Sequence, residues 1–442
     1  MLASVSVGRE RLQFVDRAHG RFPGANNFTI IVGKNGTGKS RLLRAIAMAF
    51  LAEQSSIPTI VDKELRSNFE ATSSAQWTEP PSRLIGLSTS PFDKFPLLRS
   101  APPGYPYSYL GLRGLPSVNL GLAYLGRILG KLLESVTLRP ETASSIANVL
   151  RYLRYEPSIE VSFQIPPPGA IDRLFSSERT ALTLEWGQAA RFIATLNEKE
   201  REALIRALSE THPKTRGRRM LSMAITPVGV AGTTFRWPDD DVLLLLRAGL
   251  LKLASVSLRK SDQDEPFNVS SASSGEQAVV MSLLGIGSQI QDGTVVLIDE
   301  PEVCLHPEWQ ERYIHLLFEA FSQYRGCHFI IATHSPQVVA QLPEGNCFVL
   351  SMEDARLRSA RSFSKRSVDF QLASLFNAPG FKNEYLLRSA LGAFADLSKG
   401  RELDAEAKKA VQVFRNVVGH LQDDDPVKEL ISAVLELGAR NA

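Results

Sequence analysis

Features of secreted, membrane-embedded and disulfide-bonded proteins are scarce in this sequence. Its three cysteines are too few and too scattered to form a disulfide framework or a zinc site. No apolar run reaches the roughly 18 to 20 residues that cross a bilayer, because the longest, residues 242–254, contains two basic side chains. The first 14 residues also lack the apolar core of a secretory signal. We therefore expect a cytoplasmic protein with no membrane segment.

Excess charge, internal repeats and low-complexity tracts are missing as well. The 50 basic and 47 acidic residues leave a formal net charge of only +3, so overall charge gives no argument for nucleic-acid binding. Without a fixed-period repeat or heptads, a solenoid and long coiled-coil arms are excluded. Apolar residues nevertheless make up 44% of the 442 residues, which is typical of a globular chain and, at this length, predicts about three domains.

The strongest motif is a phosphate-binding loop of residues 33–40, Gly-Lys-Asn-Gly-Thr-Gly-Lys-Ser. It follows an apolar run at 28–32 that is typical of a buried strand, and it precedes helical spacing at 40–51. An ordinary glycine-rich turn is the competing interpretation, and the complete pattern in this context argues against it. Lys39 should reach the β- and γ-phosphates of ATP, and the Ser40 hydroxyl should bind Mg²⁺. The residues expected to bind nucleotide here are Asn35, Gly36, Thr37, Gly38, Lys39 and Ser40.

An acidic pair follows a second apolar strand at residues 294–298. Asp299 would hold Mg²⁺ together with Ser40, and Glu300 would position the attacking water, since phosphoryl transfer to water needs an in-line nucleophile. Solvated acids at a strand end are the alternative interpretation. Both motifs follow the carboxyl ends of strands, where open parallel sheets bind ligands. The sequence thus predicts a catalytic site to which Lys39 and Glu300 both contribute.

A serine-rich helix start and a histidine complete the set of candidate site residues. Residues 273–277, Ser-Ser-Gly-Glu-Gln, open an apolar helix, and small hydroxyl residues with a glycine at a helix start form an anion site. We assign Ser274, Gly275 and Gln277 to nucleotide binding, with an ordinary N-cap as the alternative. His334 follows the next apolar strand and is assigned a catalytic contact with the γ-phosphate, with a structural histidine as the alternative.

Taken in their order along the chain (the P-loop, the serine-rich helix start, the acidic pair and His334), the four motifs resemble those of the ABC-type ATPase head. Residues 299–302, Asp-Glu-Pro-Glu, with residues 305–307, Leu-His-Pro, are similar to its soluble SMC-like, RecF-like and OLD-like branch rather than to transport ATPases. The resemblance implies an α/β fold, ATP and Mg²⁺ as ligands, and hydrolysis of ATP to ADP and phosphate. It also implies that Ser274 and Gly275 of one copy face the γ-phosphate bound by Lys39 of a second copy. A complete site would therefore need two copies of the chain.

The segment 87–95 stands where this family couples the nucleotide to a partner domain. It contains no glutamine, unlike the usual pattern. A coupling role for Ser90 or Asp93 and a plain surface loop are therefore both compatible with the sequence.

The expected organisation is an ATPase head with an inserted, mainly helical subdomain and a helical C-terminal region. The head comprises residues 1–94 with the P-loop and residues 220–351 with the remaining motifs. Residues 95–219 are expected to form the insertion, and residues 352–442 the C-terminal region. The last helix has a clear start signal, with Asp425 as N-cap before a proline.

The layout resembles ATPase subunits of bacterial anti-phage systems such as Septu, PARIS and retron-associated ATPases. These act with a separate effector, often a nuclease or toxin, so the resemblance implies that ATP-driven head dimerisation controls such a partner. The main alternative is a RecF-like DNA-repair ATPase that binds DNA in an ATP-dependent way. A transporter subunit and a non-hydrolysing scaffold are further alternatives.

Two basic clusters would allow nucleic-acid contact through phosphates, although solvated loops are the commoner explanation for such clusters. They are Lys214, Arg216, Arg218 and Arg219 in one segment, and Arg356, Arg358, Arg361, Lys365 and Arg366 in another.

Overall fold

The structure is a computed structural model of the chain. It describes residues 1–7, 10–15, 24–60, 73–98, 101–102, 104–115, 120–166, 189, 192–194, 196–210, 220–232, 243–246 and 248–440. The first basic cluster, at 214–219, lies outside these residues.

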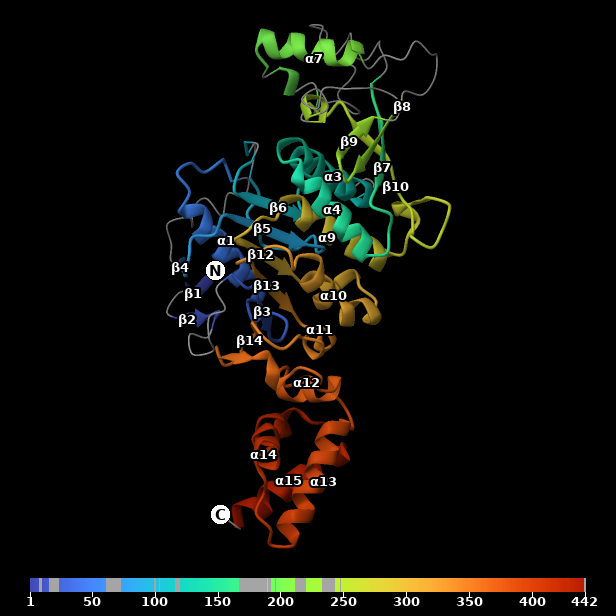
Figure 1. Ribbon diagram of the computed structural model, residues 1–442. Helices are drawn as coiled ribbons and strands as arrows, with labels where there is room; N and C mark the ends of the chain where they lie inside the picture. The colour runs from blue at the N-terminus through green and yellow to red at the C-terminus, as the bar shows by residue number, and fades with distance from the viewer. Residues whose placement is uncertain are drawn as a thin grey trace.

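A seven-stranded sheet forms the centre of the molecule (Figure 1). Its strand order is β15-β14-β3-β13-β12-β5-β6, and all neighbours run parallel except β15, which is antiparallel to β14. The strands predicted at 28–32 and 294–298 are β3 and β12, which flank β13, and every residue of these three strands is buried. The α/β prediction is therefore confirmed, and the carboxyl ends of β3, β13 and β12 meet at one edge. The strands are β3 (Asn27–Val32), β5 (Arg83–Ser88), β6 (Tyr107–Gly111), β12 (Thr294–Asp299), β13 (His328–Thr333), β14 (Cys347–Ser351) and β15 (Leu357–Ser359).

Helices cover both faces of this sheet because successive strand residues point to opposite sides. Val296 and Ile298 of β12 belong to the core shared with α3, α4, α9 and α10, whereas Val295 and Leu297 pack with α1. A small antiparallel sheet of β2, β1 and β4 lies beside α1. The bounds are α1 (Lys39–Ala52), α3 (Leu120–Leu138), α4 (Glu141–Tyr152), α9 (Ser274–Gln289), α10 (Pro307–Ala320), β1 (Leu2–Val7), β2 (Glu10–Gln13) and β4 (Ser73–Trp77).

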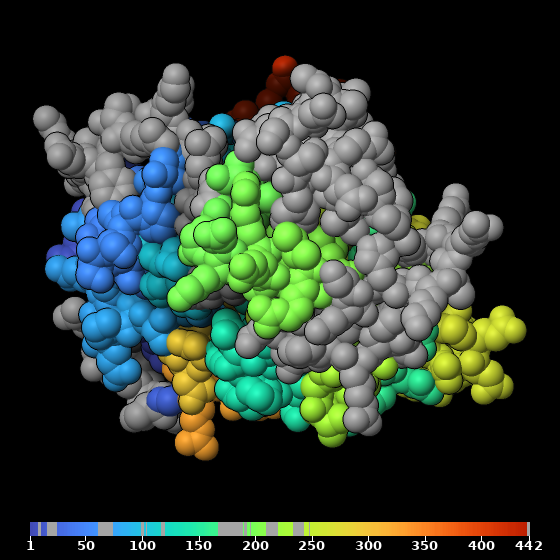
Figure 2. Space-filling view, turned by 90° about the horizontal axis from the view of Figure 1, so that it is seen from above, coloured from blue at the N-terminus to red at the C-terminus, as the bar shows by residue number. Residues whose placement is uncertain are grey.

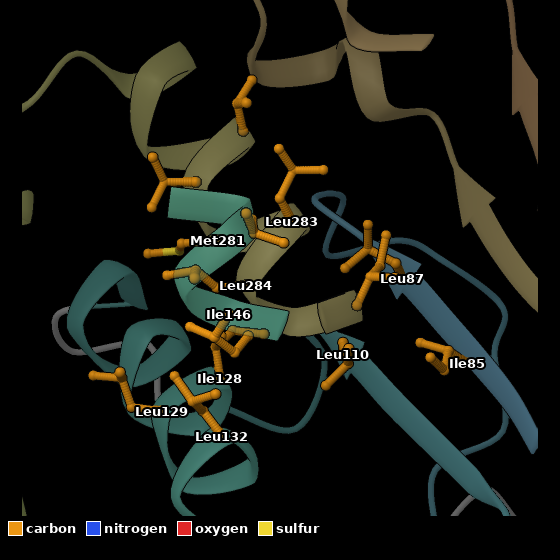
Figure 3. Close-up of a cluster of buried hydrophobic side chains, with 14 of the residues drawn as sticks. Ile85, Leu87, Leu110, Ile128, Leu129, Leu132, Ile146, Met281, Leu283 and Leu284 are labelled. Atoms are coloured by element: carbon orange, nitrogen blue, oxygen red, sulfur yellow. The ribbon is translucent and has the colours of Figure 1, made fainter. Parts of the chain in front are cut away.

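Helix α9 is the buried centre of the larger core (Figure 3). Ile85 and Leu87 of β5 lie on one side of α9, and Ile128 of α3 lies near Leu284 on the other. A Cβ on Gly285 would meet the Ile128 Cδ1 atom at 3.0 Å, so a larger residue here would require that methyl group to shift. The helix that begins with the serine-rich motif is thus held rigidly between the sheet and α3.

A second lobe contains a five-stranded antiparallel sheet of order β11-β10-β7-β8-β9. The expected insertion, 95–219, does not coincide with it: β6 lies inside that range but belongs to the central sheet, while β8 and β10 lie after it but pair with β7. Within the described residues, this sheet accompanies α3, α4 and α7. Sheet pairing joins segments that are remote in sequence, and no local pattern reveals it. The bounds are β7 (Ile159–Gln164), α7 (Glu198–Glu210), β8 (Met220–Thr226), β9 (Gly229–Gly232), β10 (Lys252–Leu258) and β11 (Phe267–Asn268).

The C-terminal helices form a separate core (Figure 1). This core lies at the opposite end of the molecule from α7. Figure 2 shows α7 in green at the surface. Asp425 caps the last helix as predicted, since the Val427 N–H donates to its Oδ1 at 2.9 Å. None of the helices in the described residues has the length and apolarity to span a bilayer. The remaining elements are η1 (Val269–Ser271), η2 (Pro301–Cys304), α11 (Pro336–Ala340), η3 (Ala360–Ser362), α12 (Val368–Ser374), α13 (Glu384–Ser398), α14 (Ala405–Val417), η4 (Val418–His420) and α15 (Pro426–Arg440).

Candidate functional site

The P-loop connects β3 to α1 and has the conformation that its glycines allow. Gly36 and Gly38 have φ angles of 82° and 97°, a left-handed region that favours glycine. Lys39 is buried, and its Nζ donates to the carbonyl oxygens of Gly33 at 2.9 Å and Lys34 at 3.3 Å. Burial lowers the pKa of Lys39, while the neighbouring carboxylates oppose that shift. An ammonium group is thus folded against the loop that would surround phosphates.

Ser40 and Asp299 bring the two predicted metal-binding motifs together. The Ser40 hydroxyl donates to Asp299 Oδ1 at 3.1 Å, across 259 positions of sequence. Burial, reinforced by neighbouring carboxylates, raises the pKa of Asp299 to about 7, against the hydrogen bond from Ser40. A hydroxyl and a carboxylate oxygen are hard ligands of the kind that Mg²⁺ takes, and a bound cation would offset the burial of the carboxylate. The residues present therefore fit a magnesium ion.

Glu300 follows β12 in a strained backbone conformation. Its φ is 47°, in the left-handed region, and its N–H donates to the Ala332 carbonyl oxygen at 2.9 Å, which ties it to the end of β13. Its side chain is 28% exposed, and its Oε1 lies 3.7 Å from His334 Nδ1. Contact with His334 lowers the pKa of Glu300 and raises that of His334. Glu300 is thus an ionised, accessible carboxylate that can orient a water molecule.

Glu302 is a site residue to which sequence analysis gave no role. Its buried Oε1 accepts hydrogen bonds from the Thr333 hydroxyl at 2.8 Å and from the His334 N–H at 2.7 Å. The His334 Nδ1 atom lies 3.1 Å from the same oxygen, closer than its 3.7 Å separation from Glu300. The only sequence signal for Glu302 is its place as a further acid after Asp299, which does not reveal that it is buried.

The serine-rich motif begins α9, and its first hydrogen bonds are local. Ser273 caps the helix by accepting from the Glu276 N–H at 3.2 Å, and the Gln277 amide donates to the carbonyls of residues 270 and 272. A Cβ on Gly275 would meet Trp309 Cδ1 at 3.3 Å, so this position favours glycine. Within the described residues, Ser274 makes no hydrogen bond to the P-loop of its own chain.

The loop after β5 is anchored by a buried aspartate. Asp93 accepts from the Tyr109 hydroxyl at 2.6 Å and the Phe95 N–H at 3.0 Å, and its Oδ1 lies 3.5 Å from an Arg113 nitrogen. Phe92, beside it, is 81% exposed. The sequence did not show which side chains of this loop would be buried.

The second basic cluster lies partly in ion pairs. Arg358 pairs with Asp354, and Arg366 pairs with Glu406 at 3.0 Å. These contacts reduce the positive charge that the cluster offers to a phosphate backbone.

Comparison with known proteins matches residues 28–340 to a family described as "AAA domain, putative AbiEii toxin, Type IV TA system". A "Retron Ec83 probable ATPase" from Escherichia coli is 31% identical over 111 residues, which is 23% of this chain and 20% of that protein. The chain therefore spans about one fifth of the length of this curated relative.

Solved structures with similarity include Stu0660 of Streptococcus thermophilus, with a TM-score of 0.34 and 11% identity over 98% of this chain and 93% of that chain. An SMC head domain from Thermotoga maritima has a TM-score of 0.26 and 15% identity, covering 79% and 94% of the two chains. A nucleotide-free ATP-binding cassette from an ABC transporter has a TM-score of 0.25 and 11% identity, covering 81% and 90%.

The family match covers more than half of the chain and includes the P-loop, the acidic pair and His334. It agrees with the ATPase predicted from the motifs. The chain belongs to the family described as "AAA domain, putative AbiEii toxin, Type IV TA system".

Proposed function

We propose that this protein binds ATP with Mg²⁺ at the carboxyl edge of its central sheet and hydrolyses it to ADP and phosphate. The observation that carries the proposal is the hydrogen bond between Ser40 and Asp299, because it unites the P-loop with the acidic strand end. Lys39 lies in the same loop, and Glu300 follows Asp299 directly.

Each side chain has a role that its environment supports. Lys39 leaves the loop carbonyls to bind the β- and γ-phosphates. Ser40 and Asp299 hold the magnesium ion, which supplies charge neutralisation at the phosphates. Glu300, ionised and accessible, orients the water in line with the γ-phosphate, and His334 contacts that phosphate.

The site is completed by a second copy of the chain in this proposal. At the start of α9 Ser274 is exposed and Gly275 is buried, and neither bonds to the P-loop of its own chain within the described residues. Closure of two heads on ATP would place this helix start against the γ-phosphate bound by Lys39 of the other copy.

ATP-driven closure then controls a separate effector, such as a nuclease or toxin, in anti-phage defence. The family description and the partial similarity to a retron ATPase support this proposal. The RecF-like alternative requires DNA contact, and the ion pairs in the second basic cluster give it no separate support.

Replacement of Glu300 by Gln tests the hydrolytic step. The variant should bind ATP but hydrolyse it about 10²- to 10⁴-fold more slowly, because an oriented carboxylate is removed at equal size. It should also accumulate as an ATP-dependent dimer, measured by analytical ultracentrifugation. Glu308→Gln, which removes one exposed charge from α10, is the matched control. Turnover by Glu300→Gln at the parental rate would exclude Glu300 as the water-orienting group.

A further inference from the structure

Glu302 is a buried carboxylate beneath the loop that carries His334. Its side chain is 4% exposed, and one oxygen, Oε1, accepts hydrogen bonds from the Thr333 hydroxyl and the His334 N–H, while the His334 Nδ1 atom lies 3.1 Å from it. The other oxygen, Oε2, is buried and has no hydrogen-bond partner among the described residues. A single carboxylate oxygen therefore holds both the backbone and the ring of residue 334.

A buried carboxylate with one unpaired oxygen, such as Glu302, is not expected to stabilise the fold. Transfer of a carboxylate from water to a buried site costs several kcal/mol, and a buried ionic group often contributes less to stability than an apolar residue of the same shape. The donors around Glu302 compensate only Oε1. Its distinctive effect is to fix the direction of a neighbouring side chain.

The contact with Glu302 determines which ring nitrogen of His334 is free. A carboxylate oxygen only accepts hydrogen bonds and repels a nitrogen lone pair, so its position 3.1 Å from Nδ1 favours a proton on that nitrogen. The Nε2 atom is then the ring nitrogen that remains for a ligand. Glu300 lies farther from Nδ1 than Glu302 does, at 3.7 Å compared with 3.1 Å. The Glu300 side chain is also more exposed, at 28% compared with 4%.

We propose that Glu302 is a positioning residue, which holds His334 with Nδ1 protonated; when the ring takes up a second proton, its Nε2–H donates to the γ-phosphate. The catalytic consequence rests on the proposed ATPase function, whereas the hydrogen bond from His334 to Glu302 does not. Glu302 itself touches neither phosphate nor water in this scheme.

The first test uses the unmodified protein and needs no activity. The full-length chain is labelled with ¹⁵N-histidine, and the His334 signal among the seven histidines is assigned by its loss in His334→Gln. At a pH of about 9, above the ordinary range of imidazole titration, neutral His334 should be the Nδ1–H tautomer. Observation of the Nε2–H tautomer, which predominates in free histidine, would overturn the proposal.

The second test separates positioning from general support. Glu302→Gln keeps the shape and an acceptor oxygen but removes the charge; it should lower kcat about 10- to 100-fold, as loss of a carboxylate behind a functional histidine does at metal sites. The affinity for ATP should change less than about 2-fold, because nucleotide binding uses the P-loop. The variant should also lose the uniform Nδ1–H tautomer of His334, with folding checked by circular dichroism. Glu308→Gln should alter none of these quantities.

The results distinguish this inference from the proposed function. A parental kcat in Glu302→Gln, or a fall of kcat matched by an equal loss of ATP affinity, would overturn the positioning role. Parental turnover in Glu300→Gln would instead contradict the proposed hydrolytic step, while the tautomer of His334 would still report on Glu302. If His334→Gln hydrolyses ATP at the parental rate, Glu302 has no catalytic consequence through that ring, and the proposal fails.

Discussion

The nucleotide edge of the central sheet and the C-terminal helical region use charged residues in opposite ways. At the sheet edge, Lys39, Asp299 and Glu302 are each at most 6% exposed, and Glu300 has a left-handed backbone. In the C-terminal region the core is apolar around Phe414, and Asp404 and Asp425 cap helices; Asp425 is buried as well, but it accepts the Val427 N–H.

The difference shows where function opposes stability. Burial raises the pKa of Asp299 and lowers that of Lys39, which means that each charged form is destabilised by its surroundings. Capping acids accept hydrogen bonds from free helix N–H groups and stabilise their helices. Removal of charge should therefore damage activity at the sheet edge and stability in the C-terminal region.

The largest expected effect is at Lys39. Lys39→Ala should lower ATP affinity by at least about 100-fold, because charged hydrogen bonds to phosphate are lost. Its melting temperature without nucleotide should be equal to or above that of the parent, since a desolvated ammonium is removed. Calorimetric titration with ATP and thermal unfolding measure both, with Lys408→Ala on α14 as the control. If Lys39→Ala bound ATP with the parental affinity, the P-loop would not be part of the ATP-binding site.

The converse variant is Phe414→Ala in the C-terminal core. Phe414 is fully buried, so its truncation should destabilise that region by about 3–5 kcal/mol. ATP turnover per folded molecule should remain at the parental level, measured well below the melting temperature. Leu391→Ala, at a position 52% exposed, should change stability by less than about 0.5 kcal/mol. If Phe414→Ala also lowered ATP turnover per folded molecule, ATP hydrolysis would depend on the C-terminal core, and the contrast between the two regions would fail.

A pH effect of intermediate size is expected from His328, at the opposite end of β13 from His334. Burial, together with the positively charged N-terminus, lowers the pKa of His328 to about 3, so the folded protein keeps this ring neutral. The unfolded chain gains a proton below about pH 6.5, so stability falls as the pH drops below that value.

Between pH 7 and pH 5, this proton uptake by the unfolded chain lowers the free energy of unfolding by about 2 kcal/mol. The difference in unfolding free energy between the parent and His328→Gln should therefore shrink by about 2 kcal/mol over that range, measured by urea unfolding. His420→Gln, at an exposed position, is the control and should show no such change. A constant difference for His328→Gln would mean that His328 accepts a proton in the folded state.

The smallest expected effect is at the cap of α14. Asp404 accepts from the Ala407 N–H at 2.7 Å, so Asp404→Ala should destabilise the protein by about 1 kcal/mol. Asp424→Ala, an exposed acid in the same region, should have less effect in the same chemical unfolding experiment. Equal effects of the two substitutions would attribute the loss to charge rather than to the cap.

Much of the head could be predicted because its signals are local. The glycine spacing of residues 33–40 and the apolar run at 294–298 each describe a segment whose conformation follows from neighbouring residues. The lobe could not be predicted in the same way, because β7 pairs with β8 and β10, which are remote in sequence. The role of Glu302 was missed since burial of an acid depends on what folds over it.

The sequence by itself determined the motifs on which the proposed chemistry rests: a glycine-rich phosphate-loop pattern and an acidic pair after an apolar strand, both encoded in short runs whose spacing sets local backbone geometry. Only the tertiary structure decided that Ser40 meets Asp299 and that Glu302, not Glu300, is the nearer partner of the His334 ring. The physical reason is that hydrogen bonds and burial act over a few ångströms in space, between residues that are separated by up to hundreds of positions in the chain.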